Sequence, residues 1–419
     1  MSKKPEIKIP LDLPDIEVIK TEMNKTGDYV ITVQSRLKTS QCRECGRQID
    51  QIHGHGRWIK LRHLPILDHK VWIRYRPKRY RCGYCEDHPT TTHQPEWYER
   101  NSPHTRAYDE YLMRCLINST VEDVRRKEDV GYDAVEGALE RHIVQAVDWQ
   151  DVTYLGTIGM DEIALRKGKR DFVLIITARH AGRTRILAVL PDRKKASARQ
   201  FFESIPHHLH ATIDAVCSDM WEGYINAAKE FAQAHEAVEI DIVIDRFHVA
   251  KAYRDGVDKL RKKEVKRLKK ALPCEQYDEI KGVMWTTRKN NADLNDDQRL
   301  QLRRFFHYSP DFKLAYTLRE ELTAIFEMAL TREQALVRLD RWQTRVRHCG
   351  LTCFDSFLRT LNNWLDEIAN YFVNRLSSGF VEGLNNKIKT IKRRCYGITN
   401  ITHLFQRIFL DLEGFRLFS

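Results

Sequence analysis

Asp161 and Asp219 are the two residues of this sequence whose type and surroundings are best suited to catalysis. Each lies in, or directly after, a short apolar stretch that is typical of a buried strand. If the two strands are neighbours in one sheet, the carboxylates converge, and they repel each other unless cations lie between them. The oxygen-seeking ions Mg²⁺ and Mn²⁺ meet that need. Two such ions can support the cleavage and formation of phosphodiester bonds.

Glu382 is the best candidate for a third acidic ligand, and the sequence around it predicts a helix. At about 100° per residue, one side of this helix is polar and basic, whereas the opposite side is apolar. We interpret Glu382 as a metal ligand and its polar neighbours as groups that hold a DNA phosphate. A solvated basic helix that happens to contain one glutamate is the alternative. The polar side consists of Glu382, Asn386, Lys389 and Arg393, and the apolar side of Leu384, Ile388 and Ile391.

Other ionisable residues compete for a place near this site. Glu222 lies on the helix predicted after Asp219, where it could contact the metal ligands without binding the metal itself. Asp245 and His248 follow the last predicted strand, and they either contact the site or DNA, or brace the helices that come next. Glu162 faces away from Asp161 if their strand is regular, because successive side chains alternate between the two faces of a sheet.

The elements predicted between residues 157 and 248 would position Asp161 and Asp219. Three strands separated by turns are followed by helix, strand, helix and strand. This order is that of a ribonuclease H-like core, a mixed five-stranded sheet with helices, in which the first and fourth strands are neighbours. Strands are predicted over residues 157–165, 171–178, 185–190, 212–218 and 239–244, and helices over 197–205 and 221–234.

Two cysteine pairs, Cys42/Cys45 and Cys82/Cys85, predict a structural zinc site. Each pair has the Cys-x-x-Cys spacing, and 36 residues separate the pairs. Four thiolates held by two tight turns suit a tetrahedral Zn²⁺ ion. Two unrelated pairs, or a redox pair, are the alternatives. Histidines that could replace one cysteine ligand are His53, His55, His88 and His93.

Basic residues crowd the segment around the second cysteine pair, with aromatic residues between them. Such a mixture suits contact with a phosphate backbone, and a solvated face of a β-ribbon is the alternative. The basic residues proposed to contact DNA are Arg74, Arg76, Lys78 and Arg79.

Residues 101–150 predict a helix-turn-helix. A short helix over 121–130 precedes Gly131, and Asp133 is expected to cap a second helix with Glu136 in a capping box. The second helix would enter the major groove of DNA and would expose Arg141. A plain helical linker is the alternative.

Residues 250–376 show helical patterns and almost no strand signals, which predicts an all-helical insertion. It begins with a dense basic segment over 251–270. We interpret this segment as a DNA contact rather than a solvated helix face, because it lies next to the predicted catalytic residues. The residues selected are Lys262, Lys263, Lys266 and Arg267.

The composition agrees with a folded protein that binds a polyanion. Hydrophobic residues make up 42% of the 419 residues, and the formal net charge is +12. Such a surplus favours nucleic acid as a partner. No apolar stretch reaches the length of about 18 residues that a membrane span needs, and the N-terminus has no signal-peptide pattern. A cytosolic location with reduced cysteines is expected.

These residues together resemble the DDE transposases of bacterial insertion sequences, of the ISL-three branch. The resemblance covers nearly the whole chain. It rests on the cysteine module, on short motifs around Asp161 and Asp219, and on the segments that carry His248, Glu382 and Asn400. The matching segments are Gly159-Met160-Asp161-Glu162, Ser218-Asp219-Met220-Trp221 with Tyr224, Asp245-Arg246-Phe247-His248-Val249, Glu382-Gly383 with Asn386 and Lys389, and Tyr396-Gly397 with Asn400 and Phe405.

The resemblance implies that Asp161, Asp219 and Glu382 form a catalytic triad that binds Mg²⁺ or Mn²⁺. It also implies that the zinc and helical modules recognise terminal inverted repeats in double-stranded DNA. The expected activity is metal-dependent DNA cleavage and strand transfer by a homodimer or a larger assembly, in the bacterial cytoplasm and at the nucleoid. A catalytically silent DNA-binding regulator and a structure-specific nuclease that does not join strands are the alternatives.

The expected fold is a multi-domain α/β protein. A zinc-binding β module and a helix-turn-helix-like domain precede a ribonuclease H-like core, which the all-helical insertion interrupts. The expected parts are 1–100 for the zinc module, 101–150 for the helix-turn-helix, 151–249 for the first part of the core, 250–376 for the insertion and 377–419 for the C-terminal helices with Glu382.

Overall fold

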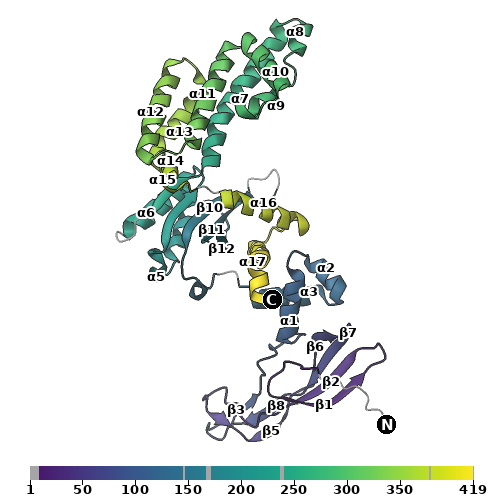
Figure 1. The fold of residues 1–419 in the computed structure, drawn as a ribbon. Helices are drawn as coiled ribbons and strands as arrows, with labels where there is room; N and C mark the ends of the chain where they lie inside the picture. The colour runs from purple at the N-terminus through teal and green to yellow at the C-terminus, as the bar shows by residue number, and fades with distance from the viewer. Residues whose placement is uncertain (1–8, 145–146, 167–170, 236–239, 377–378, 419) are drawn as a thin grey trace. The chain divides into compact units, whose positions relative to one another are not determined.

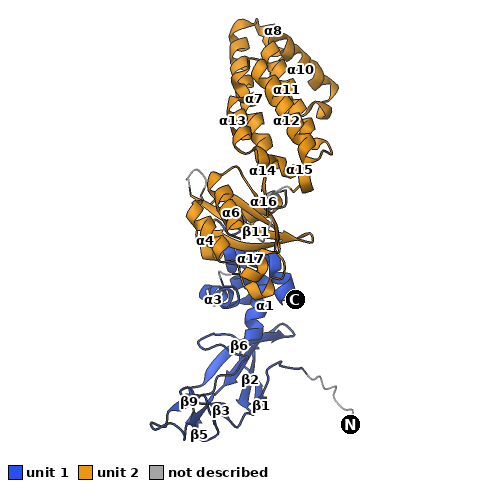
Figure 2. Ribbon diagram, turned by 90° about the vertical axis from the view of Figure 1, so that its left-hand side faces the viewer, with its two compact units in different colours: residues 1–145, 394–396, 405–419 blue, residues 146–393, 397–404 orange. Residues whose placement is uncertain are grey.

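The chain forms two compact units, which are coloured separately in Figure 2. One unit consists of residues 1–145, 394–396 and 405–419, and the other of residues 146–393 and 397–404. The computed structural model describes residues 9–144, 147–166, 171–235, 240–376 and 379–418, and for residues 379–382 it describes the backbone alone.

The first unit begins with a four-stranded sheet of order β1-β2-β7-β6. Strands β2 and β7 are parallel, and the two outer pairs are antiparallel. Alternate residues of β2 and β7 are buried, as expected for strands with one face on a core. The strands are β1 (Ile16–Met23), β2 (Tyr29–Ser35), β6 (Ile59–Ile66) and β7 (His69–Tyr75).

Five short strands surround the cysteine pairs. They form a two-stranded sheet, β3-β4, and a three-stranded sheet, β5-β8-β9. Strands this short leave most of the module in turns, which is where the cysteines lie. The strands are β3 (Ser40–Gln41), β4 (Gln48–Ile49), β5 (Ile52–His55), β8 (Lys78–Arg81) and β9 (Thr90–Thr92).

Three short helices complete the N-terminal part of this unit (Figure 1). They are α1 (Arg106–Leu116), α2 (Val121–Glu128) and α3 (Tyr132–His142). The hydroxyl of Thr105 caps α1 and that of Thr120 caps α2, each by accepting a hydrogen bond from a first-turn backbone N–H.

The capping box expected at Asp133 does not form. Helix α3 begins earlier, with the extended Gly131 as its N-cap and no side-chain cap. The carbonyl of Gly131 accepts the first helical hydrogen bonds from Ala134 and Val135, so Asp133 lies inside the first turn. There its charge still favours the positive end of the helix dipole.

Most of the last helix, α17 (Ile401–Phe418), belongs to the same unit as α1–α3, although the sequence analysis groups it with the core. Its buried Arg407 donates hydrogen bonds to the carbonyls of Leu116 and Ser119, at 3.0 and 2.5 Å. The Gln406 amide donates to the carbonyl of Ile143 at 2.8 Å. These bonds tie α17 to backbone carbonyls at the end of α1 and after α3, where the regular helical hydrogen bonds have ended.

The second unit contains a five-stranded sheet of order β12-β11-β10-β13-β14. Strands β10, β11 and β12 are antiparallel, whereas β13 and β14 run parallel to β10. This confirms the ribonuclease H-like core. The elements are β10 (Gly156–Ala164), β11 (Phe172–His180), β12 (Arg183–Leu190), α4 (Lys195–Glu203), α5 (His207–His210), β13 (Ile213–Ser218), α6 (Glu222–Ala234) and β14 (Asp241–Ile244).

Helices follow β14 without interruption by a strand as far as residue 376. The basic segment lies on one 26-residue helix, α7 (Arg246–Ala271), which packs against α11 and α13. Figure 1 shows this bundle above the sheet of the same unit. The later helices are α8 (Cys274–Asp278), α9 (Val283–Arg288), α10 (Asp296–Tyr308), α11 (Pro310–Glu327), α12 (Arg332–His348), α13 (Asp355–Asn363), α14 (Leu365–Ala369) and α15 (Tyr371–Asn374).

Helix α16 (Gly379–Arg394) returns the chain to the core sheet. Its apolar side is buried as expected, at Leu384, Ile388 and Ile391. Asn386, Lys389 and Arg393 are exposed on the other side. In the described part of the chain, no helix combines the length and the apolar character that crossing a bilayer requires.

Candidate active site and zinc centre

The pairing of β10 with β13 brings Asp161 and Asp219 to one place. Met160 on β10 lies opposite Ser218 at the end of β13, so Asp161 is the next residue of β10 and Asp219 is the first residue after β13. Burial raises the pKa of the Asp219 carboxyl to about 6, with further upward contributions from the negative charges of Glu162 and Asp161. The predicted convergence of the first and fourth strands is therefore present.

Both carboxylate oxygens of Asp161 accept hydrogen bonds. Oδ1 accepts from the backbone N–H of Glu162 at 2.7 Å, and Oδ2 accepts from the side-chain amide of Asn385 on α16. Burial raises the pKa of Asp161, and these two donors and His248 oppose that shift. Asn385 is 7% exposed, and its Oδ1 has no hydrogen-bond partner among the described residues.

Asn385 is a site residue that the sequence analysis did not select. The available signal was a polar side chain beside the buried stripe of Leu384 and Ile388. A buried amide needs hydrogen-bond partners, and Asp161 supplies one. The contact joins residues 224 positions apart in the sequence, so no local pattern could identify the partner.

Glu382 lies on α16, three residues before Asn385. Residues three apart on a helix occupy neighbouring positions on the same side. The backbone of residue 382 is therefore one turn away from the residue that contacts Asp161. The side chain of Glu382 is outside the part of the chain that the structure describes, and its predicted role as a metal ligand stays a prediction.

Glu162 lies beside Asp219 and is held by two side chains. Its carboxylate accepts a hydrogen bond from the Tyr224 hydroxyl at 3.0 Å and one from Arg193 at 3.3 Å. The guanidinium of Arg193 lies over the ring of Trp221, 4.2 Å from its centroid, and Trp221 donates a hydrogen bond to the Arg193 carbonyl at 3.0 Å. This arrangement partly balances the negative charge next to Asp219.

Asp245 and His248 also lie near the aspartate pair. Oδ1 of the buried Asp245 accepts a hydrogen bond from the Phe247 backbone N–H at 3.1 Å, which caps helix α7. Nε2 of His248 is 4.0 Å from Oδ2 of Asp245. The charge of His248 lowers the pKa of Asp161 and of Asp219. Glu222, in contrast, is exposed on the first turn of α6.

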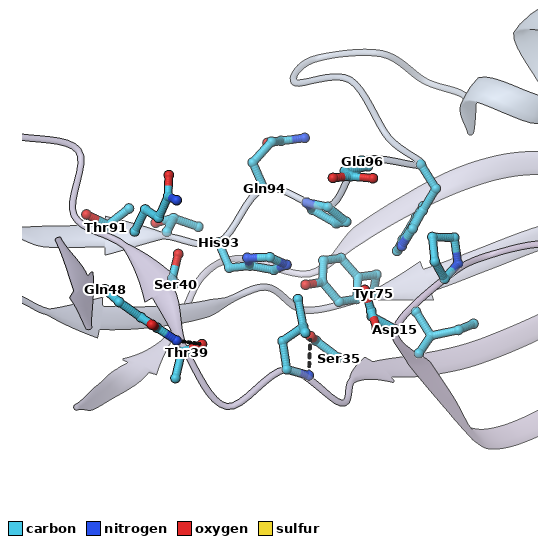
Figure 3. Close-up of a pocket in the computed structure, with 17 residues that line it drawn as sticks. Asp15, Ser35, Thr39, Ser40, Gln48, Tyr75, Thr91, His93, Gln94 and Glu96 are labelled. Atoms are coloured by element: carbon cyan, nitrogen blue, oxygen red, sulfur yellow. Dashed lines mark hydrogen bonds between the residues drawn. The ribbon is translucent and has the colours of Figure 1, made fainter. Parts of the chain in front are cut away.

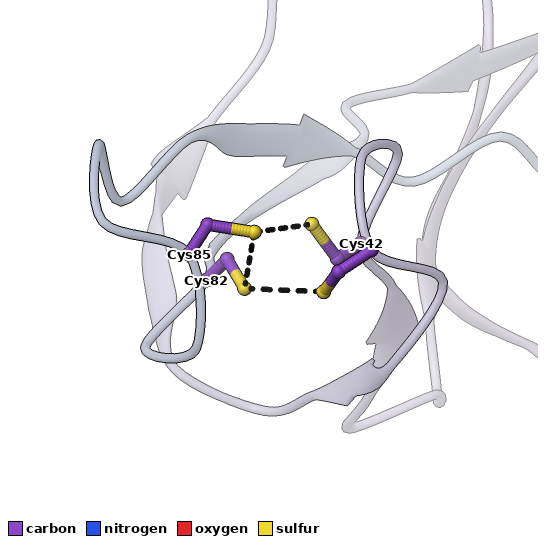
Figure 4. Close-up of side chains that lie close together, drawn as sticks. Cys42, Cys82 and Cys85 are labelled. Atoms are coloured by element: carbon purple, nitrogen blue, oxygen red, sulfur yellow. Dashed lines mark hydrogen bonds between the residues drawn. The ribbon is translucent and has the colours of Figure 1, made fainter.

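The four predicted zinc ligands form one cluster, shown in Figure 4. Their sulfur atoms all lie within 4.8 Å of one another, and three of the separations are 3.6, 3.8 and 3.9 Å. A tetrahedral zinc ion with Zn–S bonds of about 2.3 Å requires sulfur separations of about 3.8 Å. Cys42, Cys45, Cys82 and Cys85 therefore fit structural Zn²⁺ without a histidine.

The backbone also prepares Cys42 to act as a thiolate. Hydrogen bonds from the N–H groups of Cys45 and Glu44 lower the pKa of the Cys42 thiol to about 6. Zinc binds thiolates rather than thiols. The tight turn thus supplies both the ligand spacing and the charge state that the metal needs.

The basic residues of the N-terminal module differ in their exposure and in their hydrogen-bond partners. Arg74 and Arg76 are exposed. Arg74 stacks on Trp58 at 4.5 Å, and Nε of Arg76 donates a hydrogen bond to the carbonyl of Gly56 at 3.1 Å. Lys78 donates a hydrogen bond to the carbonyl of Leu37 at 2.9 Å, and Arg79 donates one to Thr90 at 2.8 Å. Because Arg74 and Arg76 are exposed and Lys78 and Arg79 are half-buried, the first two are better placed for an external phosphate.

Arg141 on α3 is committed to an internal ion pair. Its guanidinium donates two hydrogen bonds, at 2.9 and 2.7 Å, to the buried carboxylate of Asp109. The other oxygen of Asp109 contacts His104 at 2.8 Å. This contact gives Arg141 a structural partner, and the predicted contact with DNA stays untested.

Helix α7 presents part of its basic segment to solvent. Lys263 and Lys266 are exposed, whereas Lys262 pairs with Asp258 at 3.1 Å and Arg267 with Glu264 at 2.6 Å. Lys263 and Lys266 are the residues of this set best placed to meet a phosphate.

The first unit also contains a polar cavity of about 660 Å³, shown in Figure 3. Its lining contains Asp15, His93 and Glu96 but no lysine or arginine. The hydroxyl of the buried Tyr75 has no hydrogen-bond partner in the described part of the chain. A lining of this charge does not suit a phosphate, and Asp161 and Asp219 belong to the other unit.

Comparison with known proteins places the chain in one family. Residues 158–408 match the family model of the ISL3-type DDE transposases, described as a transposase. Residues 38–85 match the zinc finger of the transposases IS204, IS1001, IS1096 and IS1165.

Two curated relatives match over almost their full length. The transposase for insertion sequence element IS1001 of Bordetella parapertussis is 28% identical over 390 residues, which cover 92% of this chain and 91% of that protein. The transposase for IS1557 of Mycobacterium tuberculosis is 22% identical over 431 residues, which cover 96% and 93%. A chain of the Drosophila P element transposase strand transfer complex is 12% identical, with a TM-score of 0.44 over 75% of this chain and 94% of that one. The two family matches confirm the resemblance, and the chain belongs to the ISL3 family of DDE transposases.

Proposed function

We propose that the protein cuts DNA at the ends of its own insertion sequence and joins those ends to target DNA. The observation that carries the proposal is the meeting of Asp161 and Asp219 on neighbouring strands, with Asn385 of α16 bonded to Asp161. Family membership supports the transposase activity in general. The site of action would be the nucleoid in the bacterial cytoplasm.

Asp161 and Asp219 would hold Mg²⁺ or Mn²⁺, together with Glu382. Two buried carboxylates with raised pKa values fit this role, because a cation would relieve the repulsion that burial intensifies. Their oxygen donors suit these hard cations. When bound, such ions stabilise the charge that develops on the attacking and leaving oxygens of a phosphodiester.

The reaction would proceed in two transfers at phosphorus. In the first, water loses a proton as its oxygen bonds to the phosphorus at the element's end, and the bond from that phosphorus to the 3′ oxygen breaks. That oxygen takes up a proton and becomes a free 3′-hydroxyl. In the second, the 3′-hydroxyl oxygen bonds to a phosphorus of target DNA, loses its proton, and displaces a 3′ oxygen of the target strand.

The protein's own residues would orient these partners. The Asn385 amide donates a hydrogen bond to one carboxylate oxygen of Asp161, and the backbone N–H of Glu162 donates one to the other. Together these two donors would fix the orientation of the carboxylate. Asn386, Lys389 and Arg393, which are exposed on α16, would contact phosphates near the cut. Lys262, Lys263, Lys266 and Arg267 on α7 would hold flanking DNA.

The zinc module and helices α1–α3 would recognise the terminal inverted repeats. The exposed Arg74 and Arg76 beside Trp58 support contact with the DNA backbone. Two ends must be processed together for an element to move, so we infer at least a homodimer on DNA.

The decisive experiment is a cleavage and strand-transfer assay with the Asp219→Asn variant on DNA that carries a terminal repeat. We expect loss of Mg²⁺-dependent cleavage with DNA binding retained. Unchanged cleavage would contradict the assignment. In the unmodified protein, binding without any cleavage would favour a silent regulator, and cleavage of ends without joining of pre-cut ends would favour a nuclease.

A further inference from the structure

Three histidines gather at the end of the core opposite the aspartates. His207 and His210 lie on α5, directly before β13, whereas Asp219 follows the other end of that strand. His235 caps the C-terminus of α6. The ring centroids of His210 and His235 are 4.3 Å apart, and those of His207 and His210 are 5.3 Å apart.

Backbone carbonyls determine which nitrogen of each inner ring carries the proton. Nε2 of His210 is 2.9 Å from the carbonyl oxygen of Ile205, and Nδ1 of His235 is 2.9 Å from that of Phe231. A carbonyl can only accept, so each of these nitrogens is the N–H donor. The lone pairs then lie on Nδ1 of His210 and on Nε2 of His235.

The lone pair of His210 is buried without a hydrogen bond. His210 is 7% exposed, and within the described residues its Nδ1 has no partner. Burial and the neighbouring histidines lower the pKa of His210. A buried polar atom without a partner in a native fold calls for an explanation, and a ligand is one.

A histidine whose N–H donates to a carbonyl while its other nitrogen is free has the arrangement found in metal sites, where the carbonyl orients the ring and raises its basicity. A tetrahedral metal at about 2.1 Å from two imidazole nitrogens places the ring centres about 5 Å apart. The two measured separations, 4.3 and 5.3 Å, are close to this value, and the rings of His210 and His235 meet edge to face with their planes at 82°.

We propose that His210 and His235, completed by His207, bind a divalent transition-metal ion such as Zn²⁺ or Ni²⁺. Imidazole nitrogens suit these ions rather than Mg²⁺. Among the described residues, only the cysteine cluster already has three ligand atoms within 4.8 Å of one another. The histidine site would therefore close by rotation of His207, which is exposed and free to turn.

The ion would link α5 to the end of α6, two segments 25 residues apart that flank β13 and Asp219. A ligand that binds only the folded state stabilises it in proportion to its occupancy. The proposed ion is thus structural. It does not depend on the proposed DNA chemistry, and either proposal can fail without the other.

The test titrates the full-length protein, prepared with one zinc ion per chain, with Ni²⁺ and measures bound nickel and retained zinc by elemental analysis. We expect one nickel per chain with the cysteine-bound zinc retained. His235→Asn and His210→Asn should weaken nickel binding at least tenfold. The matched control is His208→Asn, which removes an exposed neighbour on α5 and should bind nickel as the unmodified protein does.

Circular dichroism checks that each variant folds. If His210→Asn does not fold, the half-buried His235 at the helix end still provides the decisive variant. The proposal is overturned if nickel does not bind, if it binds only by displacing zinc, or if both His235→Asn and His208→Asn bind it equally well.

Discussion

Burial of the Asp219 carboxyl at the end of β13 determines how this site responds to pH. Its pKa is about 6 in the folded chain, well above the ordinary value of 3.8, because burial and nearby carboxylates disfavour the ionised form. The metal-free fold therefore binds this proton more tightly than the unfolded chain does. The resulting stabilisation is present below about pH 4 and is lost as the pH rises through about 6.

We predict that Asp219→Asn stabilises the protein in the absence of added Mg²⁺. At pH 8 the free energy of unfolding should rise by about 1 to 3 kcal/mol, since a buried charge is removed. At pH 4 the variant and the unmodified protein should differ little. Urea denaturation at the two pH values measures this, with the exposed Glu203→Gln as control. Equal free energies of unfolding for Asp219→Asn and the unmodified protein at pH 8 would show that burial of the ionised carboxylate does not destabilise the fold.

Asn385 offers a second prediction at the scale of one residue. Asn385→Ala removes the donor that orients Asp161, so cleavage should fall about 10- to 100-fold, and the Mg²⁺ concentration needed for half-maximal rate should rise. The exposed neighbour Asn386 is the matched comparison. Asn386→Ala should weaken DNA binding without a change in the Mg²⁺ requirement, and a Mg²⁺ requirement that Asn385→Ala leaves unaltered would argue against the positioning role.

At the scale of elements, the short strands and tight turns around the cysteines are too small to be stable without a bound metal. Their small core around Cys42, Ile49, Tyr80 and Cys82 buries little apolar surface. Modules of this size commonly depend on a metal for their folding energy. The zinc ion is thus expected to hold the DNA-recognition surface in shape.

We predict that Cys82→Ser lowers the zinc content by one ion per chain and abolishes binding to terminal-repeat DNA. The core sheet should remain folded, because the cysteine cluster belongs to the other compact unit. Elemental analysis and a DNA-binding assay test this, with Cys274→Ser, an exposed cysteine on α8, as control. Full zinc content in Cys82→Ser would exclude the four-cysteine site.

The exposed lysines of helix α7 are expected to make DNA binding depend on salt. Each phosphate that a lysine neutralises releases counterions, so DNA affinity falls as salt rises. Lys263→Gln and Lys266→Gln should each reduce the slope of log affinity against log salt by about 1. Lys313→Gln, an exposed lysine on α11, should leave the slope as it is. Unchanged slopes in the α7 variants would place the DNA elsewhere.

At the scale of the whole molecule, the helical bundle accounts for the long stretch of sequence between Asp219 and Glu382, the second and third predicted metal ligands. Glu382 follows Asp219 by 163 residues, and α7–α15 fill most of that interval. Helix α16 then packs its apolar side on the core and brings Asn385 to Asp161. The last helix continues into the unit of α1–α3, so the chain returns from the core to the predicted recognition helices.

We predict that the active complex contains at least two protein chains. Mass measurement of the protein with terminal-repeat DNA should find a species with two chains and two DNA ends, because both ends must be cut for transfer. A complex of one chain with one end that completes strand transfer would contradict the inferred dimer.

Local patterns in the sequence determined much of this protein. Short apolar stretches separated by turns identified the five core strands, the helical period separated the buried and exposed sides of α16, and the cysteine spacing identified the zinc ligands. Each of these properties depends on residues close together in the chain, where backbone geometry relates spacing directly to direction. The prediction of a cap at Asp133 was wrong, because the extended Gly131, two residues earlier, is the N-cap of this helix.

Only the tertiary structure decided which distant groups meet. Asn385 against Asp161, Arg141 against Asp109, and His210 against His235 are contacts between segments that sequence spacing does not relate. Buried polar groups must find hydrogen-bond partners wherever packing places them. The partner therefore depends on how helices and strands pack together, which the local sequence of either segment does not contain.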